Sequence, residues 1–220
     1  AREKVARFIN AAHTHEVIFT RGTTESINLV ASSFGEAFIQ PGDEIIVSQL
    51  EHHSNYVPWF ELCQRKGARF RVIPFTPTGE LDLAVLQSMF TAKTRLLALN
   101  QVSNSLGTVN PLEVIIPLAH AAGVPVLVDA AQSVQHLTAR DVQALDADFY
   151  AFSGHKMYAP MGIGVLYAKE SWLEKLPPYQ FGGEMIDQVS STRVTFTQLP
   201  HKFEAGTPNV EGAVGLGAAV

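Results

Sequence analysis

The stretch Val124-Pro125-Val126-Leu127-Val128-Asp129-Ala130-Ala131-Gln132 decides the fold. An apolar run that ends in a carboxylate is typical of a central parallel strand, buried on both faces, whose last side chain points into the crevice at the carboxyl edge of an open α/β sheet. A carboxylate in such a place needs a fixed cationic partner, because an unpaired buried charge is strongly destabilising. The sequence therefore predicts a ligand-binding edge with Asp129 at its centre.

A lysine follows the next predicted strand. Lys156 lies in Ser153-Gly154-His155-Lys156, shortly after the strand-like run Asp148-Phe149-Tyr150-Ala151-Phe152. Burial favours the neutral form of an amine, which is the form that attacks an aldehyde. A carboxylate that holds a pyridinium N–H and an amine that bonds an aldehyde predict a site for pyridoxal 5'-phosphate. A structural ion pair between Asp129 and Lys156, or a lysine that extends into solvent, is the simpler alternative.

Strand-like runs alternate with helical patterns along most of the chain. Apolar runs predict strands at residues 17–20, 44–47, 70–73, 96–99, 124–128, 149–152 and 164–168, and helical spacing predicts helices at residues 24–39, 56–66, 81–90 and 111–122. This alternation predicts the α/β class, with a mostly parallel central sheet and helices on both of its faces. A loop-rich stretch begins at Pro177-Pro178, and we interpret it as a flap over the site.

Both ends of the chain carry helical patterns that are cut short. Residues 1–12 have apolar side chains at helical spacing but no capping residue before them, and residues 212–220 open a helix without a stop signal. We therefore expect residues 1–220 to form one large domain of a longer polypeptide, with an N-terminal segment and a C-terminal small domain outside the chain.

The composition is that of an ordinary globular protein, with 46% hydrophobic and 17% charged residues. A net charge of -5 argues against a nucleic-acid partner. No apolar run reaches the roughly 20 residues of a membrane helix, and no signal peptide is recognisable, so we expect no membrane association and a cytoplasmic location. The single cysteine, Cys63, excludes an internal disulfide.

Gly22-Thr23-Thr24 forms a predicted turn between a strand and a helix. The free N–H groups and the dipole at a helix start favour a phosphate dianion, and threonine hydroxyls add further donors. Thr24 is the first candidate, and simple N-capping by a threonine is the alternative. Ser153 and His155, which flank Gly154 next to the lysine, complete the predicted phosphate site.

Six short segments occur in an order that is typical of group II cysteine desulfurases. They are Arg21-Gly22-Thr23-Thr24-Glu25-Ser26-Ile27-Asn28, Glu51-His52-His53-Ser54-Asn55, Val102-Ser103-Asn104, Val128-Asp129-Ala130-Ala131-Gln132, Ser153-Gly154-His155-Lys156 and Glu204-Ala205-Gly206-Thr207-Pro208-Asn209. From residue 1 to residue 220 the chain resembles this family, which belongs with selenocysteine lyases and cysteine sulfinate desulfinases to the class V aminotransferase branch of the fold-type I pyridoxal phosphate enzymes. Six motifs in order are far more specific than one.

The resemblance implies roles for individual residues. Thr24, Ser153 and His155 would hold the cofactor phosphate, and Thr207 would reach the phosphate of a partner subunit, which implies a homodimer. His52 would stack on the ring and move protons, a task that suits an imidazole. The implied cofactor-binding set is Thr23, Thr24, His52, Asn104, Asp129, Gln132, Ser153, His155, Lys156 and Thr207, with Lys156 and His52 as the catalytic pair.

Some of these residues have plainer interpretations without the resemblance. Asn104, which would position the ring or the substrate carboxylate, and Gln132, which would bind the phenolic oxygen, are otherwise ordinary loop amides. The His52-His53 pair would otherwise be packed or solvent-facing histidines. Neither that pair nor His13-Thr14-His15 has cysteines or carboxylates at zinc spacings, so we predict no metal site.

The chain also departs from the family pattern. The resemblance implies that a persulfide-forming cysteine and an arginine for the substrate carboxylate belong to the small domain, outside these residues. Cys63 lies in an amphipathic helical pattern and is expected to pack as a small hydrophobe. Ala159 and Met161 stand where the family often has a glycine and a threonine. We therefore expect residues 1–220 alone not to transfer sulfur.

The activity implied by the resemblance is the conversion of L-cysteine to L-alanine, with the sulfur left as a persulfide for an acceptor protein, as in iron–sulfur cluster assembly. A selenocysteine lyase, a cysteine sulfinate desulfinase or a class V aminotransferase would use the same lysine and aspartate. A non-catalytic fragment that only dimerises is an alternative of another class. A nicotinamide enzyme is disfavoured, because Gly162-Ile163-Gly164 is only part of the required glycine fingerprint.

Overall fold

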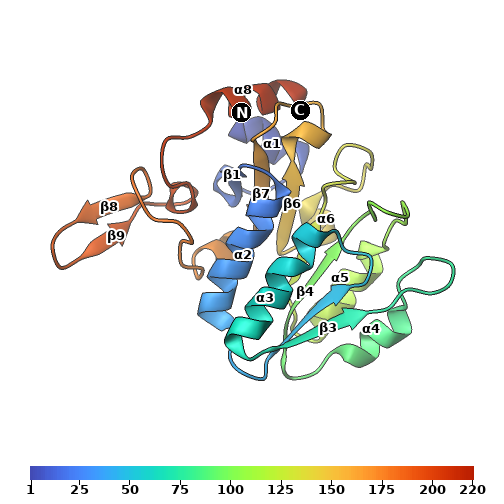
Figure 1. The fold of residues 1–220 in the computed structure, drawn as a ribbon. Helices are drawn as coiled ribbons and strands as arrows, with labels where there is room; N and C mark the ends of the chain where they lie inside the picture. The colour runs from blue at the N-terminus through green and yellow to red at the C-terminus, as the bar shows by residue number, and fades with distance from the viewer.

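The computed structural model describes all residues, 1–220, and shows a central sheet with helices on both faces (Figure 1). The seven-stranded sheet has the order β1-β7-β6-β5-β4-β2-β3. Its strands are β1 (Val17–Thr20), β2 (Glu44–Ser48), β3 (Arg69–Ile73), β4 (Thr94–Asn100), β5 (Val126–Asp129), β6 (Phe149–Ser153) and β7 (Gly164–Ala168). Neighbours from β3 to β6 are parallel, whereas β7 is antiparallel to both β6 and β1. The predicted α/β class with a mostly parallel sheet is confirmed.

The helices divide between the two faces of the sheet. One face is covered by α2 (Thr23–Phe38), α3 (Val57–Lys66) and α7 (Glu170–Leu173). The other is covered by α1 (Arg2–Phe8), α4 (Leu83–Met89), α5 (Leu112–Ala121), α6 (Val142–Leu145) and α8 (Val210–Ala219). Short 3-10 helices, η1 (Thr14–Glu16), η2 (His53–Asn55), η3 (Gly154–Lys156) and η4 (His201–Phe203), complete the element order. None of the helices combines the length and apolar character that crossing a bilayer would require.

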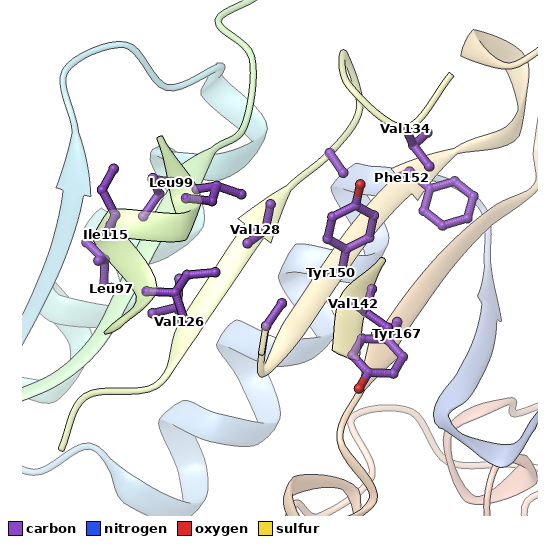
Figure 2. Packing of buried hydrophobic residues seen from close by; sticks show 14 of the residues in the cluster. Leu97, Leu99, Ile115, Val126, Val128, Val134, Val142, Tyr150, Phe152 and Tyr167 are labelled. Carbon is purple, nitrogen blue, oxygen red and sulfur yellow. The ribbon is translucent and has the colours of Figure 1, made fainter. Parts of the chain in front are cut away.

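The central strands are mostly apolar because both of their faces are buried, whereas the edge strand β3 carries Arg69 and Arg71 and is largely unburied. In β5, Val126 and Val128 belong to a core of 30 buried residues on one face, and Leu127 between them belongs to a core of 22 on the other. Figure 2 shows the first core, where Val126 and Val128 lie between Leu97 of β4 and Tyr150 of β6. This alternation explains why the deciding stretch is a continuous apolar run rather than a polar–apolar alternation.

Element boundaries differ from the predicted ones by a few residues. β5 begins at Val126 rather than at Val124, because Pro125 has no N–H to donate to the sheet, although its carbonyl accepts from Leu97 N at 3.0 Å. α4 begins at Leu83, because the Asp82 side chain accepts the Val85 N–H at 3.0 Å and so caps the helix there. The helix over residues 111–122 ends at Ala121, just before Gly123, whose φ is +72°.

The stretch after Pro177 is not only a loop. It contains an antiparallel hairpin, β8 (Ile186–Val189) and β9 (Val194–Phe196), which projects away from the sheet (Figure 1). No residue of the hairpin belongs to either core. The predicted flap is therefore an exposed two-stranded element of its own.

Candidate active site

The parallel strands bring the predicted site residues to one edge of the sheet. β2, β4, β5 and β6 are mutually parallel, and β1 runs in the same direction because two antiparallel pairings separate it from β6. Their carboxyl ends therefore lie at a common edge, which is where open α/β sheets bind ligands. The segments that leave this edge carry Thr23, His52, Asn104, Asp129 and Lys156.

Asp129 is the last residue of β5 and is 5% exposed. Its Oδ1 accepts the Ala131 N–H at 2.9 Å, and its Oδ2 accepts no hydrogen bond from the chain. Burial raises the pKa of Asp129, and the Ala131 N–H, Lys156 and His52 oppose that rise. The structure thus brings Lys156 and His52 within electrostatic reach of a poorly solvated carboxyl group.

Lys156 is the last residue of η3, a single turn that starts directly after β6. The turn is tight at Gly154, whose N–H donates to Ile163 O at 2.9 Å and where a Cβ would stand 2.8 Å from Ile163 Cγ2. The half-buried lysine forms no ion pair with Asp129 or with any other carboxylate of the chain. The structural ion pair that was the simpler alternative is therefore not formed.

His52 lies at the start of η2, after β2. Its Nδ1 accepts the backbone N–H of Ser54 at 3.1 Å. Because a backbone N–H can only donate, this contact requires an unprotonated Nδ1 and leaves the proton of the neutral ring on Nε2. His52 is exposed and is therefore accessible to a ligand at the sheet edge.

The predicted phosphate cradle is assembled by hydroxyl groups at the start of α2. Thr23 N–H donates to Ser153 Oγ at 2.8 Å, and Thr23 Oγ1 lies 2.7 Å from the same oxygen. Thr24 Oγ1 lies 2.7 Å from Ser54 Oγ, which in turn lies 3.0 Å from His52 Nδ1. The start of α2 is thus connected through Ser153 to the turn that carries Lys156, and through Ser54 to the loop that carries His52.

The remaining predicted residues are less closely tied to this cluster. His155 and Asn104 are exposed, Gln132 is half-buried, and none of the three donates or accepts a side-chain hydrogen bond within the chain. Thr207 is exposed in the segment between η4 and α8, where it lines a surface cavity with Arg21. The structure therefore gathers Thr23, Thr24, His52, Asp129, Ser153 and Lys156, and leaves Thr207 outside that group.

Two structural contributors to the site were not assigned from the sequence. Ser54, which links Thr24 to His52, stands in the quoted segment Glu51-His52-His53-Ser54-Asn55 but has no distinctive pattern of its own. Gly164, at the start of β7, lies so close to the β1–α2 turn that an added Cβ would stand 2.4 Å from Gly22 Cα. Such a contact between distant segments has no local sequence signal.

Comparison with protein families decides the relationship of the chain. The sequence model of the family described as aminotransferase class-V matches residues 1–220. The chain belongs to the class-V aminotransferase family. The cysteine desulfurase of Serratia proteamaculans (strain 568) is 57% identical over 220 residues, which are 100% of this chain and 54% of that relative.

Solved structures are also similar to the chain. The crystal structure of the cysteine desulfurase CsdA, in an S-sulfonic acid form, from Escherichia coli is 50% identical, has a TM-score of 0.96, and is matched over 99% of this chain and 54% of its own. A C-DES mutant with glycine covalently linked to its PLP cofactor is 28% identical, with a TM-score of 0.88 over 99% of this chain and 57% of its own. The chain therefore spans about half the length of these relatives. The resemblance to cysteine desulfurases is confirmed.

Proposed function

We propose that this protein is a cysteine desulfurase that uses pyridoxal 5'-phosphate, and that residues 1–220 form its large, cofactor-binding domain. The observation that carries the proposal is the arrangement of Asp129, Lys156 and His52 at one edge of the sheet, beside the Thr23–Ser153 hydroxyl pair. Identity of 57% to a cysteine desulfurase over the whole chain supports the choice of reaction.

The chemistry of the donor set fits the cofactor. Asp129 Oδ2 accepts no hydrogen bond from the chain, so it is available to the N–H of a pyridinium ring, which would also compensate the buried charge. The first turn of α2, a helix of 16 residues, offers free amides together with the Thr23 and Thr24 hydroxyls to a phosphate dianion. Lys156 has no carboxylate partner that would hold its amine away from an aldehyde.

When bound, pyridoxal phosphate supplies an electron sink for the α-carbon of an amino-acid substrate. The chain supplies the groups around it. Lys156 Nζ would hold the cofactor aldehyde and then carry the α-proton of the substrate. His52 would act through Nε2, since Nδ1 is engaged by the Ser54 N–H. Asp129 would keep the ring nitrogen protonated, and Gln132 and Asn104 would orient the ring from the adjoining loops.

The proposal includes a homodimer in which Thr207 serves the site of the partner subunit. Thr207 is exposed, and its segment is fixed at both ends, because Glu204 Oε1 accepts the Phe19 N–H at 2.7 Å and Asn209 Nδ2 donates to Gly162 O at 2.9 Å. A threonine presented outward on a fixed segment is suited to a neighbouring molecule. A cytoplasmic location and a sulfur-acceptor protein for iron–sulfur cluster assembly complete the proposal.

Lys156→Ala in the full-length protein provides the main test. We expect the wild type to convert L-cysteine to alanine, releasing sulfide when a reducing thiol is present. The variant should lose the visible absorption of bound cofactor. Alanine formation should fall by about 10³-fold or more, because the Lys156 amine would both bind the cofactor aldehyde and transfer the α-proton of the substrate. Lys93→Ala is the matched control, since Lys93 is exposed just before β4, at the opposite edge of the sheet, and should leave both readouts unchanged.

Three substrates separate the related activities. Cysteine sulfinate, selenocysteine, and an amino acid paired with a 2-oxo acid acceptor should each react more slowly than cysteine in the same assay. If amino-group transfer to the 2-oxo acid were faster than alanine formation from cysteine, the activity would be that of an aminotransferase and not of a desulfurase. If the wild type acquires no visible absorption on adding pyridoxal phosphate, the non-catalytic alternative is correct and the proposed function is wrong.

A further inference from the structure

Glu51 stands directly before His52 and has a carboxyl group that three elements enclose. Asn100 N–H, at the end of β4, donates to Oε1 at 2.9 Å, and Asn55 Nδ2, in η2, donates to Oε2 at 2.6 Å. The hydroxyl of Ser48, at the end of β2, also contacts Oε1. The residue as a whole is half-buried, but its carboxyl group lies inside the protein among these three partners.

The partners of Glu51 are themselves fixed. Asn100 pairs in register with Asp129 on the neighbouring strand, and its Nδ2 donates to Leu50 O at 2.6 Å. The Oδ1 of buried Asn55 accepts Trp59 Nε1–H at 2.9 Å. Glu51 therefore connects the loop that carries His52 to the strand beside Asp129 and, through Asn55, to the buried Trp59 of α3.

The charge of Glu51 also bears on Asp129. Burial raises the pKa of Glu51 to about 8, with the Asp129 carboxylate adding to the rise and the three hydrogen bonds opposing it. A mostly neutral Glu51 at pH 7 avoids a second negative charge near Asp129, which also interacts electrostatically with Lys156, His52 and the Tyr150 hydroxyl. Ser48 Oγ is the one partner able to accept the acid proton, because amide N–H groups only donate.

We propose that Glu51 is a positioning residue of the site, which fixes the His52 loop against the strand next to Asp129. The contacts that support this role all lie within the chain. The cofactor readout below rests on the proposed function, whereas the His52 readout does not.

The experiment compares Glu51→Gln with Glu44→Gln in the full-length, cofactor-free protein. A glutamine cannot satisfy all three partners, because its NH₂ group must face either Asn100 N–H or Asn55 Nδ2. We expect the NMR resonances of the His52 ring to shift and the affinity for pyridoxal phosphate to fall about tenfold, the effect of one lost hydrogen bond. Resonances are assigned with His52→Gln.

Glu44→Gln is the matched control, because Glu44 is a buried glutamate at the start of β2, the strand that precedes Glu51, and is bound by Arg71 and Thr91. It should lower stability but leave the His52 resonances in place and the cofactor affinity within about twofold. Equal effects of both variants would mean general loosening and would overturn the inference.

Other results are equally decisive. Unchanged His52 resonances together with unchanged cofactor affinity in Glu51→Gln would overturn the inference. If Glu51→Gln does not fold, Ser48→Ala removes only one partner, and it should shift the same resonances by a smaller amount; no shift there also rejects the positioning role. Shifted resonances in a protein whose wild type binds no pyridoxal phosphate would instead reject the proposed function and leave the positioning role standing.

Discussion

Asp129 occupies an environment that raises the free energy of its charged form. It is buried at the end of a central strand, with a single hydrogen bond from the Ala131 N–H. Lys156 and His52 lower its pKa only in part, since burial is the largest effect and the pKa remains raised. Destabilised ionisable groups of this kind concentrate at functional sites. A cationic ligand at Oδ2 would remove the penalty, so binding energy and folding stability are coupled at this residue.

The replacement Asp129→Asn should therefore stabilise the cofactor-free protein at neutral pH. Because the pKa is raised on folding, the native state holds its proton more tightly than the unfolded state, and stability falls as pH rises from about 4 toward the folded pKa. The asparagine has no such dependence and retains an Oδ1 acceptor for Ala131. Urea denaturation from pH 4 to pH 8 should show that the free energy of unfolding of Asp129→Asn increases relative to that of the wild type as pH rises.

Asp141→Asn provides a control of opposite sign. Asp141 caps α6, and the N–H of Ala144 holds its pKa below the usual range. A lowered pKa contributes stability that is present above the unfolded pKa of about 4 and lost as pH falls. Asp141→Asn should therefore be less stable than the wild type at pH 7, by roughly 0.5 kcal/mol for an exposed cap, and match it at low pH. If Asp129→Asn behaves in the same way, Asp129 is not destabilised.

At the scale of elements, the proposed phosphate cradle depends on a close approach between the β1–α2 turn and the start of β7. The two segments meet at glycines, and a Cβ on Gly164 would stand 2.4 Å from Gly22 Cα and 2.8 Å from Gly22 N. Backbone atoms cannot move aside as a side-chain end can. The absence of a side chain at Gly164 is thus what allows Thr23 to reach Ser153, 2.8 Å from N to Oγ.

Gly164→Ala should separate these elements. We expect it to destabilise the protein by about 1–3 kcal/mol, as overpacking generally does, and to weaken pyridoxal phosphate binding by displacing the start of α2 from Ser153. Gly182→Ala is the control, because a Cβ at Gly182 meets nothing within 4 Å. Denaturant unfolding and cofactor titration measure the two effects. Wild-type affinity in Gly164→Ala would show that the close approach is not required for the cradle.

The elements that could be predicted from the sequence are those with strong local patterns. All seven strands of the sheet contain clustered apolar residues, six of the strands are largely buried, and each was found within two residues of its predicted bounds. The antiparallel direction of β7 could not be predicted, because a strand buried on both faces has the same pattern in either direction. The β8–β9 hairpin was missed because its strands are only four and three residues long, which is too short for a period-two pattern to be recognised.

The residues of the candidate site also differ in whether a local sequence pattern marks them. The proximity of Asp129 and Lys156 could be predicted because Asp129 ends one recognisable strand and Lys156 follows the next, and the sheet topology brings such positions together. Ser54 and Glu51 could not, since their importance comes from hydrogen bonds to Thr24 and Asn100, in elements far away in the sequence. No single-chain pattern specifies such pairings. The partner-subunit role of Thr207 stays a prediction.

At the scale of the whole molecule, the sheet separates packing from chemistry. Two apolar cores cover its faces, and the predicted reactive groups lie at its carboxyl edge. Cys63, the one thiol in residues 1–220, is a packing residue. It lies on α3, is 1% exposed, and packs in the core between the helices and the sheet. Burial raises the pKa of its thiol to about 11, so almost no thiolate forms at neutral pH.

A desulfurase needs a thiolate that can reach the substrate sulfur, and Cys63 meets neither condition. Cys63→Ala in the full-length protein should therefore keep alanine and sulfide formation within about twofold of wild type, while losing about 1 kcal/mol of stability from the small cavity. Cysteine turnover and thermal unfolding measure the two quantities. Loss of sulfide formation in a variant with a normal cofactor spectrum would make Cys63 the nucleophile. Retained turnover would mean that the reactive thiol is supplied from outside residues 1–220.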